Sequence, residues 1–182
     1  MLESFRNILY PSTNNYQQGM SFEQKVLIRG VEPLDVIRCF HDRKFVEFLT
    51  ALQPVKIKSW RGINDEMEAS FSFWFFGWRE IRVVHKNYRV TRSSLEFEDL
   101  GMKLPFGLSH WNHHHIVELH EKGTVIVDKV EMSHQSLVKR YFIIPIMLFP
   151  VFIRRFTYRI WFYLMEGNTW DSFKRFKSNE KI

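Results

Sequence analysis

The sequence predicts an α+β domain in which a curved antiparallel sheet is covered by one long helix near the C-terminus. Two observations carry this prediction. Residues 55–132 form short runs of aromatic and β-branched residues separated by turn residues, which is typical of an antiparallel meander. Residues 146–165 instead repeat apolar side chains at helical spacing. With 182 residues, the chain is long enough to bury one substantial core.

The segment before the meander predicts one strand and two short helices. Residues 21–30 alternate as a strand does and end at a glycine. In residues 31–42, Pro33 suits the first turn of a helix, and the apolar residues that follow it share one face. A second short helix is expected at residues 43–52, before Pro54.

Six further strands and the last helix complete the predicted order. The strands are expected at residues 55–60, 67–76, 78–91, 94–100, 110–120 and 124–132. Pro145 and Pro150 are expected to set or kink the start of the last helix, and Gly167 to stop it. On that helix a solvated polar stripe is expected, made of Arg154, Arg155, Tyr158 and Arg159.

Composition narrows the classes of function. Eighteen Phe, six Trp and six Tyr are more than a small core needs, which indicates either a wide core or a lined cavity. The single cysteine, Cys39, excludes an internal disulfide, so a cytosolic protein is expected. The net charge of +6 suits nucleic acid or an anionic membrane surface, but the basic residues are scattered and no nucleic-acid-binding motif accompanies them. No nucleic-acid partner is therefore predicted.

The N-terminal residues and the most apolar run of the chain do not predict a targeting or membrane-spanning segment. Residues 1–20 lack the apolar core of a signal peptide and predict a polar extension, and residues 166–182 predict a basic tail. The longest uncharged apolar run, Tyr141–Ile153, contains two prolines and is shorter than the ~20 residues of a membrane-spanning helix. It predicts a buried segment.

Five of the eight histidines lie within residues 110–120. Side chains alternate along an extended strand, so Trp111, His113 and His115 share one face. This face is the more apolar and is expected to point into the concave side of the sheet. His114 is expected to point outward.

The next strand brings a carboxylate toward these histidines. If Lys122-Gly123 form a two-residue hairpin loop, Val117 pairs with Asp128. Asp128 then lies on the inner face, diagonal to His115 and within reach of a long side chain. A longer loop would change the register and turn Asp128 outward.

The trio of His113, His115 and Asp128 has three interpretations. Two histidines and a carboxylate can bind zinc or iron, but Glu118 lies on the wrong strand face to complete a cupin-like motif, and no metal is predicted. The trio can also act as a general acid or base. No nucleophile is obvious from the sequence, and Cys39, Ser70 and Ser72 are candidates only because they are present. The third interpretation, which we favour, is that these are satisfied polar groups inside a sheet, which can also bind the polar end of a ligand.

Four motifs in a fixed order resemble the START-like, or SRPBCC, superfamily, in its uncharacterised bacterial branch. They are EPLDVIRCFHD (Glu32–Asp42), PFGLSHWNHHHIV (Pro105–Val117), GTVIVDKVEM (Gly123–Met132) and FTYR (Phe156–Arg159). Val117 and Met132 replace aromatic residues of the pattern. The resemblance covers about residues 21–165.

The resemblance implies a helix-grip fold: a curved sheet of about seven strands, two short helices after the first strand, a long C-terminal helix and an apolar cavity between helix and sheet. It implies a ligand-binding domain at residues 21–165 that holds a hydrophobic guest such as a lipid, a polyketide or an isoprenoid-like molecule. It implies no cofactor. The guest itself and the oligomeric state stay undetermined.

We therefore predict a binding protein whose cavity holds a hydrophobic small molecule. The predicted ligand-binding residues are Phe71, Phe73, Phe75, Trp111, His113, His115, Asp128 and Phe156. One alternative is an enzyme of cyclase, dehydratase or hydrolase type that uses His113, His115 and Asp128 as catalytic groups. Another is a peripheral protein that makes weak membrane-surface contact through its basic C-terminal region, made of the stripe of Arg154, Arg155 and Arg159 together with Trp161 and residues 173–177.

Overall fold

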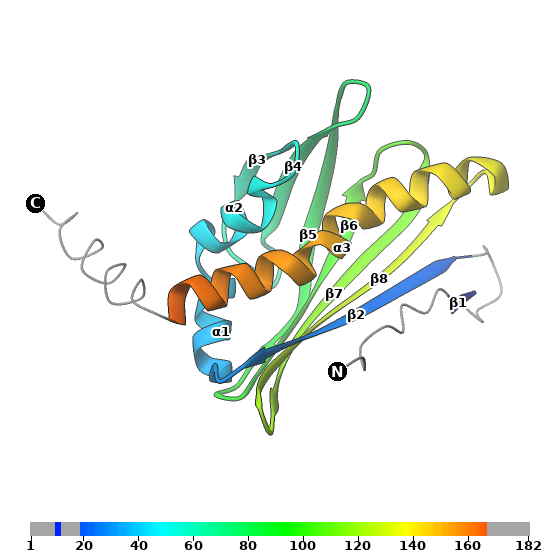
Figure 1. The fold of residues 1–182 in the computed structure, drawn as a ribbon. Coiled ribbons are helices and arrows are strands. Elements are labelled where there is room, and N and C mark those ends of the chain that lie inside the picture. The colour runs from blue at the N-terminus through cyan, green and yellow to red at the C-terminus, as the bar shows by residue number, and fades with distance from the viewer. Residues whose placement is uncertain (1–9, 12–18, 167–182) are drawn as a thin grey trace, which may run out of the picture.

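In the computed structural model, which describes residues 10–11 and 19–166, a twisted antiparallel sheet is crossed by one long helix (Figure 1). The elements in chain order are β1 (Tyr10–Pro11), β2 (Met20–Arg29), α1 (Pro33–Phe40), α2 (Arg43–Ala51), β3 (Val55–Trp60), β4 (Glu68–Trp74), β5 (Trp78–Val90), β6 (Ser94–Lys103), β7 (Leu108–His120), β8 (Gly123–His134) and α3 (Leu137–Glu166). In space the strands follow the order β1-β2-β8-β7-β6-β5-β4-β3. Seven long strands and a two-residue edge strand therefore confirm the predicted fold class.

Most residues of the two chain ends lie outside the described part of the structure. Of the predicted polar extension, Tyr10–Pro11 pairs with Met20 and Ser21 of β2, and residues 1–9 and 12–18 lie outside the described residues. The predicted basic tail begins where α3 ends, at Glu166, so Gly167 and the rest of the tail also lie outside.

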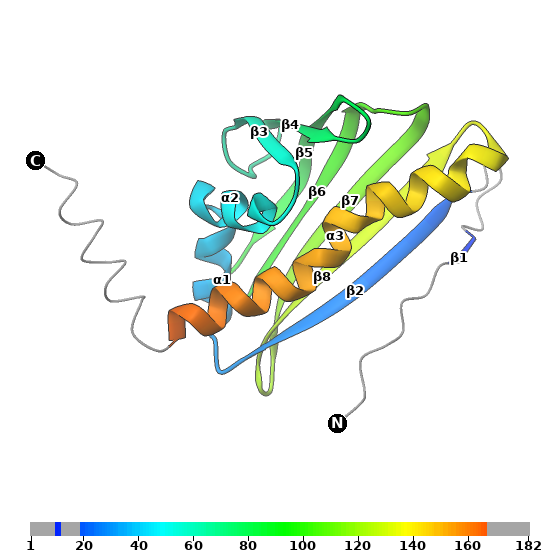
Figure 2. The same cartoon turned by 45° about the horizontal axis from the view of Figure 1, so that its top comes forward.

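The helices cover the concave face of the sheet, α1 and α2 at one end and α3 along its length (Figures 1 and 2). Pro33 stands at the start of α1, as predicted. Asp42 caps α2, because its Oδ1 accepts a hydrogen bond from Lys44 N at 3.0 Å. A cap of this kind is worth about 1 kcal/mol.

Helix α3 is longer than the sequence predicted. It begins at Leu137, so Pro145 and Pro150 lie inside it rather than at its start. Each proline removes one backbone hydrogen bond, but the helix continues through both because its inner side packs on the sheet. Within it, Tyr141–Tyr163 has the length and composition of a membrane span, and 28% of its most apolar 18-residue stretch is buried. The core helix of a soluble protein can have the same length and composition.

The predicted orientation of α3 was wrong. Tyr158, expected on a solvated stripe, is 0% exposed, and the Arg154 side chain is 19% exposed. Phe156, expected on the inner face, is 50% exposed. The helix turns its polar pair inward because the sheet offers both side chains a buried carboxylate, Asp128.

The β7–β8 turn also differs from the prediction. Its two turn residues are Glu121 and Lys122, and Gly123 already pairs with Arg29 in the sheet. Gly123 has φ +136°, and a Cβ there would lie 2.2 Å from the Ile28 carbonyl oxygen, so only glycine lets β2 approach this closely. The pairing shifts by two residues and preserves the strand faces.

Two hydrophobic clusters fill the space between helices and sheet. One gathers around Phe45 and Trp161, where α1, α2 and the end of α3 meet. The other gathers around Trp111 and Met147, under the first half of α3. Between them, polar side chains cross the sheet.

Candidate functional site

A row of buried polar side chains runs across five neighbouring strands. Cross-strand pairing sets Gln24 beside Asp128, Asp128 beside His115, His113 beside Asp99, and Asp99 beside His85. With two residues of α3 they form what we call the polar belt: Gln24, His85, Asp99, His113, His115, Asp128, Arg154 and Tyr158. All of them face the interior because each occupies an inward position of the strand alternation or the inner side of α3.

Asp128 is the centre of the polar belt. It is 0% exposed, and its Oδ1 lies 3.1 Å from His113 Nε2, 3.3 Å from the Tyr158 hydroxyl, which donates to it, and 3.6 Å from an Arg154 guanidinium nitrogen. Its Oδ2 accepts a hydrogen bond from Gln24 at 3.0 Å. Burial alone would raise the pKa of Asp128, but the hydrogen bond with His113, the contact with His115 and the charge of Arg154 hold it well below its usual value.

His115 lies between the two carboxylates. Its Nε2 is 3.2 Å from Asp99 Oδ2, and its Nδ1 is 3.2 Å from Asp128 Oδ1, an ionic contact without hydrogen-bond alignment. The ring stacks on Phe97, with centroids 4.4 Å apart and planes inclined by 15°. Burial would lower the pKa of His115, but Asp99 and Asp128 outweigh it and the pKa is raised, so the imidazolium form is favoured.

His113 has the opposite electrostatic environment. Burial and the neighbouring His115 lower its pKa to about 4, although its hydrogen bond to Asp128 opposes this shift. The two imidazole centroids are only 3.9 Å apart, so both rings cannot easily be charged together. His113 is therefore neutral at neutral pH.

Asp99, whose side chain is 15% exposed, supplies the second carboxylate. Its Oδ1 is 2.7 Å from His85 Nδ1. Burial raises the pKa of Asp99, but the charge and hydrogen bond of His115 and the hydrogen bond of His85 hold it well below its usual value. Two carboxylates, the Arg154 guanidinium and the His115 imidazolium thus balance one another in charge.

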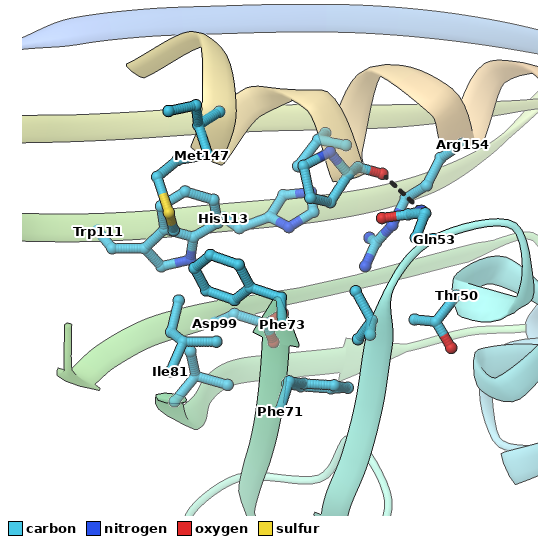
Figure 3. A pocket seen from close by; sticks show the side chains of 15 residues that line it. Thr50, Gln53, Phe71, Phe73, Ile81, Asp99, Trp111, His113, Met147 and Arg154 are labelled. Carbon is cyan, nitrogen blue, oxygen red and sulfur yellow. Dashed lines mark hydrogen bonds between the residues drawn. The ribbon is translucent and has the colours of Figure 1, made fainter. Parts of the chain in front are cut away.

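A cavity of about 100 Å³ lies against this belt, between α3 and β3–β5 (Figure 3). Its apolar wall consists of Val55, Phe71, Phe73, Ile81, Val83, Trp111, Ile146, Met147, Pro150 and Val151. Its polar wall consists of Thr50, Gln53, Asp99, His113 and Arg154. Figure 3 shows Gln53 and Arg154 at one side of the cavity and Phe73, Trp111 and Met147 at the other. For comparison, an apolar cavity of about 150 Å³ holds benzene.

The predicted site residues fall into three groups. Phe71, Phe73, Trp111 and His113 line the cavity. His115 and Asp128 lie behind His113 in the polar belt. Phe75 packs instead on Phe76 and Phe106, and Phe156 lies on the outer side of α3, so neither contributes to the cavity wall. His114 lies on the outer face beside Glu96, as predicted.

Sequence reasoning missed Asp99, Gln24 and Arg154 as site residues. The signal for Asp99 was present, because Leu95, Phe97 and Asp99 alternate on one face of β6. Gln24 likewise alternates with the buried Phe22 and Val26 of β2. For Arg154 the sequence carries no such signal, because the apolar residues of α3 do not all lie on one side of the helix and so do not show which side faces the sheet.

None of the three candidate nucleophiles reaches the site. Cys39 is buried in the cluster around Phe45, and burial raises the pKa of its thiol to about 11. Ser70 and Ser72 lie on the face of β4 opposite to the cavity-lining Phe71. Covalent catalysis by these groups has no support in the described structure.

Asp99, His113 and His115 bring possible metal-ligating atoms within 4.8 Å of one another. The fit to a divalent cation is poor. The ion would have to displace a proton from a ring nitrogen of His115, whose imidazolium form Asp99 and Asp128 favour, and it would lie close to the Arg154 guanidinium. We assign no metal to this cluster.

Comparison with known proteins identifies the fold. No protein-family description matches the sequence, and no curated protein matches it. Among solved structures, protein Ms6760 from Mycobacterium smegmatis has a TM-score of 0.56 at 8% identity, over 81% of this chain and 92% of that chain. The protein of unknown function SA2116 from Staphylococcus aureus has a TM-score of 0.53 at 11% identity, over 86% and 99%.

The chain shares the fold of these two proteins, an antiparallel sheet crossed by a long C-terminal helix, which is the predicted helix-grip architecture. The di-domain ARO/CYC StfQ from the steffimycin biosynthetic pathway is a weaker match, with a TM-score of 0.48 at 10% identity, over 68% of this chain and 40% of that chain. Identities this low establish a shared fold only. The function must therefore be argued from the cavity and the polar belt.

Proposed function

We propose that the protein binds an uncharged small molecule with a compact apolar body and one hydrogen-bonding group. The cavity beside the polar belt is the observation that carries this proposal. Phe71, Phe73 and Met147 offer the apolar contacts, and His113 offers a neutral imidazole at the cavity wall. The cavity is smaller than one that encloses benzene, so it suits a small ring that it encloses in part, or the end of a larger lipid, polyketide or isoprenoid-like molecule.

The charge balance of the polar belt supports an uncharged guest. The charges of Asp99 and Asp128 are matched by those of Arg154 and His115, so an ionised ligand would add an uncompensated charge to a buried site. A hydroxyl or carbonyl group can instead exchange hydrogen bonds with His113 at no such cost. The guest class we propose is therefore a phenol, an alcohol or a ketone.

Native mass spectrometry with a cavity-filling variant tests this proposal. Val83 lines the cavity on β5, and Val83→Phe should fill much of its volume. The matched control is Val90→Phe, at an exposed position of the same strand. Protein purified from its own host should carry an uncharged organic species that Val90→Phe keeps and Val83→Phe loses.

If the guest dissociates during purification, phenol serves as the probe. It is added to both variants, and its binding is followed by ligand-observed NMR. Binding to Val90→Phe and not to Val83→Phe supports the proposal. Equal phenol binding by the two variants, or none by wild type, rejects it. Thermal unfolding of both variants checks that the added volume has not unfolded the protein.

A second function is favoured by one contact. His113 lines the cavity and lies 3.1 Å from Asp128, as a histidine oriented by a carboxylate for acid or base chemistry does. If the protein is an enzyme, His113→Asn should retain an unreacted guest while wild type releases its product. Identical species recovered from both proteins would exclude this function and leave binding.

The cytosolic location stays a prediction.

A further inference from the structure

The side of α3 that faces away from the sheet is apolar along the length of the helix. Seven large side chains there are between 40% and 72% exposed. They form the outer aromatic face: Val138, Tyr141, Phe142, Phe149, Phe156, Ile160 and Tyr163. Their spacing repeats with the helical period, so they form one continuous stripe. Soluble proteins rarely leave a stripe of this kind uncovered.

The charges beside this stripe have a single sign. Lys139, Arg155 and Arg159 belong to the same helix, and residues 137–165 contain no Asp or Glu. The Arg155 guanidinium lies 4.4 Å over the Phe152 ring. Partial burial and the adjacent Arg159 charge lower the pKa of Arg155, which an approaching anion would relieve.

We propose that the outer aromatic face of α3 docks on an anionic membrane surface. Aromatic side chains on one side of a helix with basic residues at its border suit the boundary between lipid head groups and acyl chains. A second copy of this chain fits less well, because a two-fold contact would bring the basic borders together without a carboxylate between them. This surface keeps Arg155 and Arg159 of the C-terminal region that the sequence suggested. It does not include Trp161, which is buried against Phe45 and Phe48.

Docking would bring the cavity close to the lipid. Met147 and Pro150 line the cavity from the inner side of α3, while Phe149, between them in sequence, points outward. The wall between cavity and membrane is then one helix thick. The docking proposal nevertheless stands on the outer face alone and does not depend on what the cavity holds.

Vesicle co-sedimentation of the full chain tests the proposal. The probes are vesicles of pure phosphatidylcholine and vesicles of equimolar phosphatidylcholine and phosphatidylglycerol. Wild type should bind the anionic vesicles, and added salt should weaken this binding. Phe149→Ser and Phe156→Ser should each lower the partition coefficient by about tenfold. Arg159→Gln should lower it by about fivefold, and only on anionic vesicles.

The matched control is Leu119→Ser, which removes an exposed apolar side chain at the β7–β8 end of the sheet and should leave binding unchanged. Unchanged thermal unfolding of the α3 variants separates lost docking from lost folding. Failure of wild type to bind anionic vesicles overturns the proposal, as does equal binding to neutral vesicles. A dimer in size-exclusion chromatography that Phe149→Ser dissociates, without vesicle binding, would assign the face to a second copy instead.

Discussion

Replacing Asp128 with asparagine tests the polar belt at its centre. The carboxylate is completely buried, and donors approach both of its oxygens: His113 and Tyr158 at Oδ1 and Gln24 at Oδ2. In Asp128→Asn the amide nitrogen must face one of these donors. Turning the Gln24 amide would accommodate it only by pointing Gln24 Oε1 at the Val151 carbonyl, which Nε2 now contacts at 2.6 Å.

The magnitude follows from the charge that the substitution removes. The guanidinium of Arg154, 3.6 Å from Asp128, and the imidazolium of His115, 3.2 Å away, would both lose a buried counter-charge. Breaking a buried ion pair from one side costs about 3–5 kcal/mol, and we expect a loss in this range. With a urea m-value of about 2 kcal/mol/M, the unfolding midpoint at neutral pH should fall by about 2 M.

Asp35→Asn is the control for this substitution. Asp35 is exposed and forms an ion pair with Arg38 within α1, so its loss should change the free energy of unfolding by less than about 0.5 kcal/mol. A loss below about 1 kcal/mol for Asp128→Asn would refute the reasoning, because it would mean that the buried group carries no charge in the folded protein.

Two further predictions concern pH and the β7–β8 turn. The pKa of His113 falls from 6.5 to about 4 on folding, so the unfolded chain binds more protons between these values and stability decreases as the pH falls through them. Between pH 7 and pH 5, the free energy of unfolding of His113→Asn, measured with urea, should therefore decrease by about 2 kcal/mol less than that of wild type. An equal decrease in the two proteins would contradict the lowered pKa of His113. Gly123→Ala should cost at least about 2 kcal/mol more than Gly77→Ala in thermal unfolding, because both glycines have positive φ but only Gly123 meets backbone atoms, and equal costs would contradict this.

The sequence predicted the sheet well because its turns are chemically marked. Residues 55–60 were expected as a strand and form β3 with the same bounds, between a helix that ends near Pro54 and a turn at Gly62. His113 and His115 were predicted to point inward because they alternate with Trp111 along the strand. This prediction did not depend on the length of the β7–β8 turn. That is why an error of two residues in pairing left the face of Asp128 correct.

The cavity and the orientation of α3 were less accessible from sequence. Arg154 and Tyr158 look like solvent-facing residues until Asp128, which lies 26 residues before Arg154, is known to meet them. The same rotation puts Phe156 outside, and only the folded contacts decide it. The start of α3 was missed because Pro145 and Pro150 weaken a helix locally, while packing on the sheet restores it.

A crystal structure of the protein purified from its own host tests the central claim most directly. Electron density for an uncharged organic molecule between Phe71, Phe73 and Met147, with a polar atom within hydrogen-bond distance of His113, is the result that we predict. A cavity that holds only ordered water, or one that side chains have closed, would contradict it.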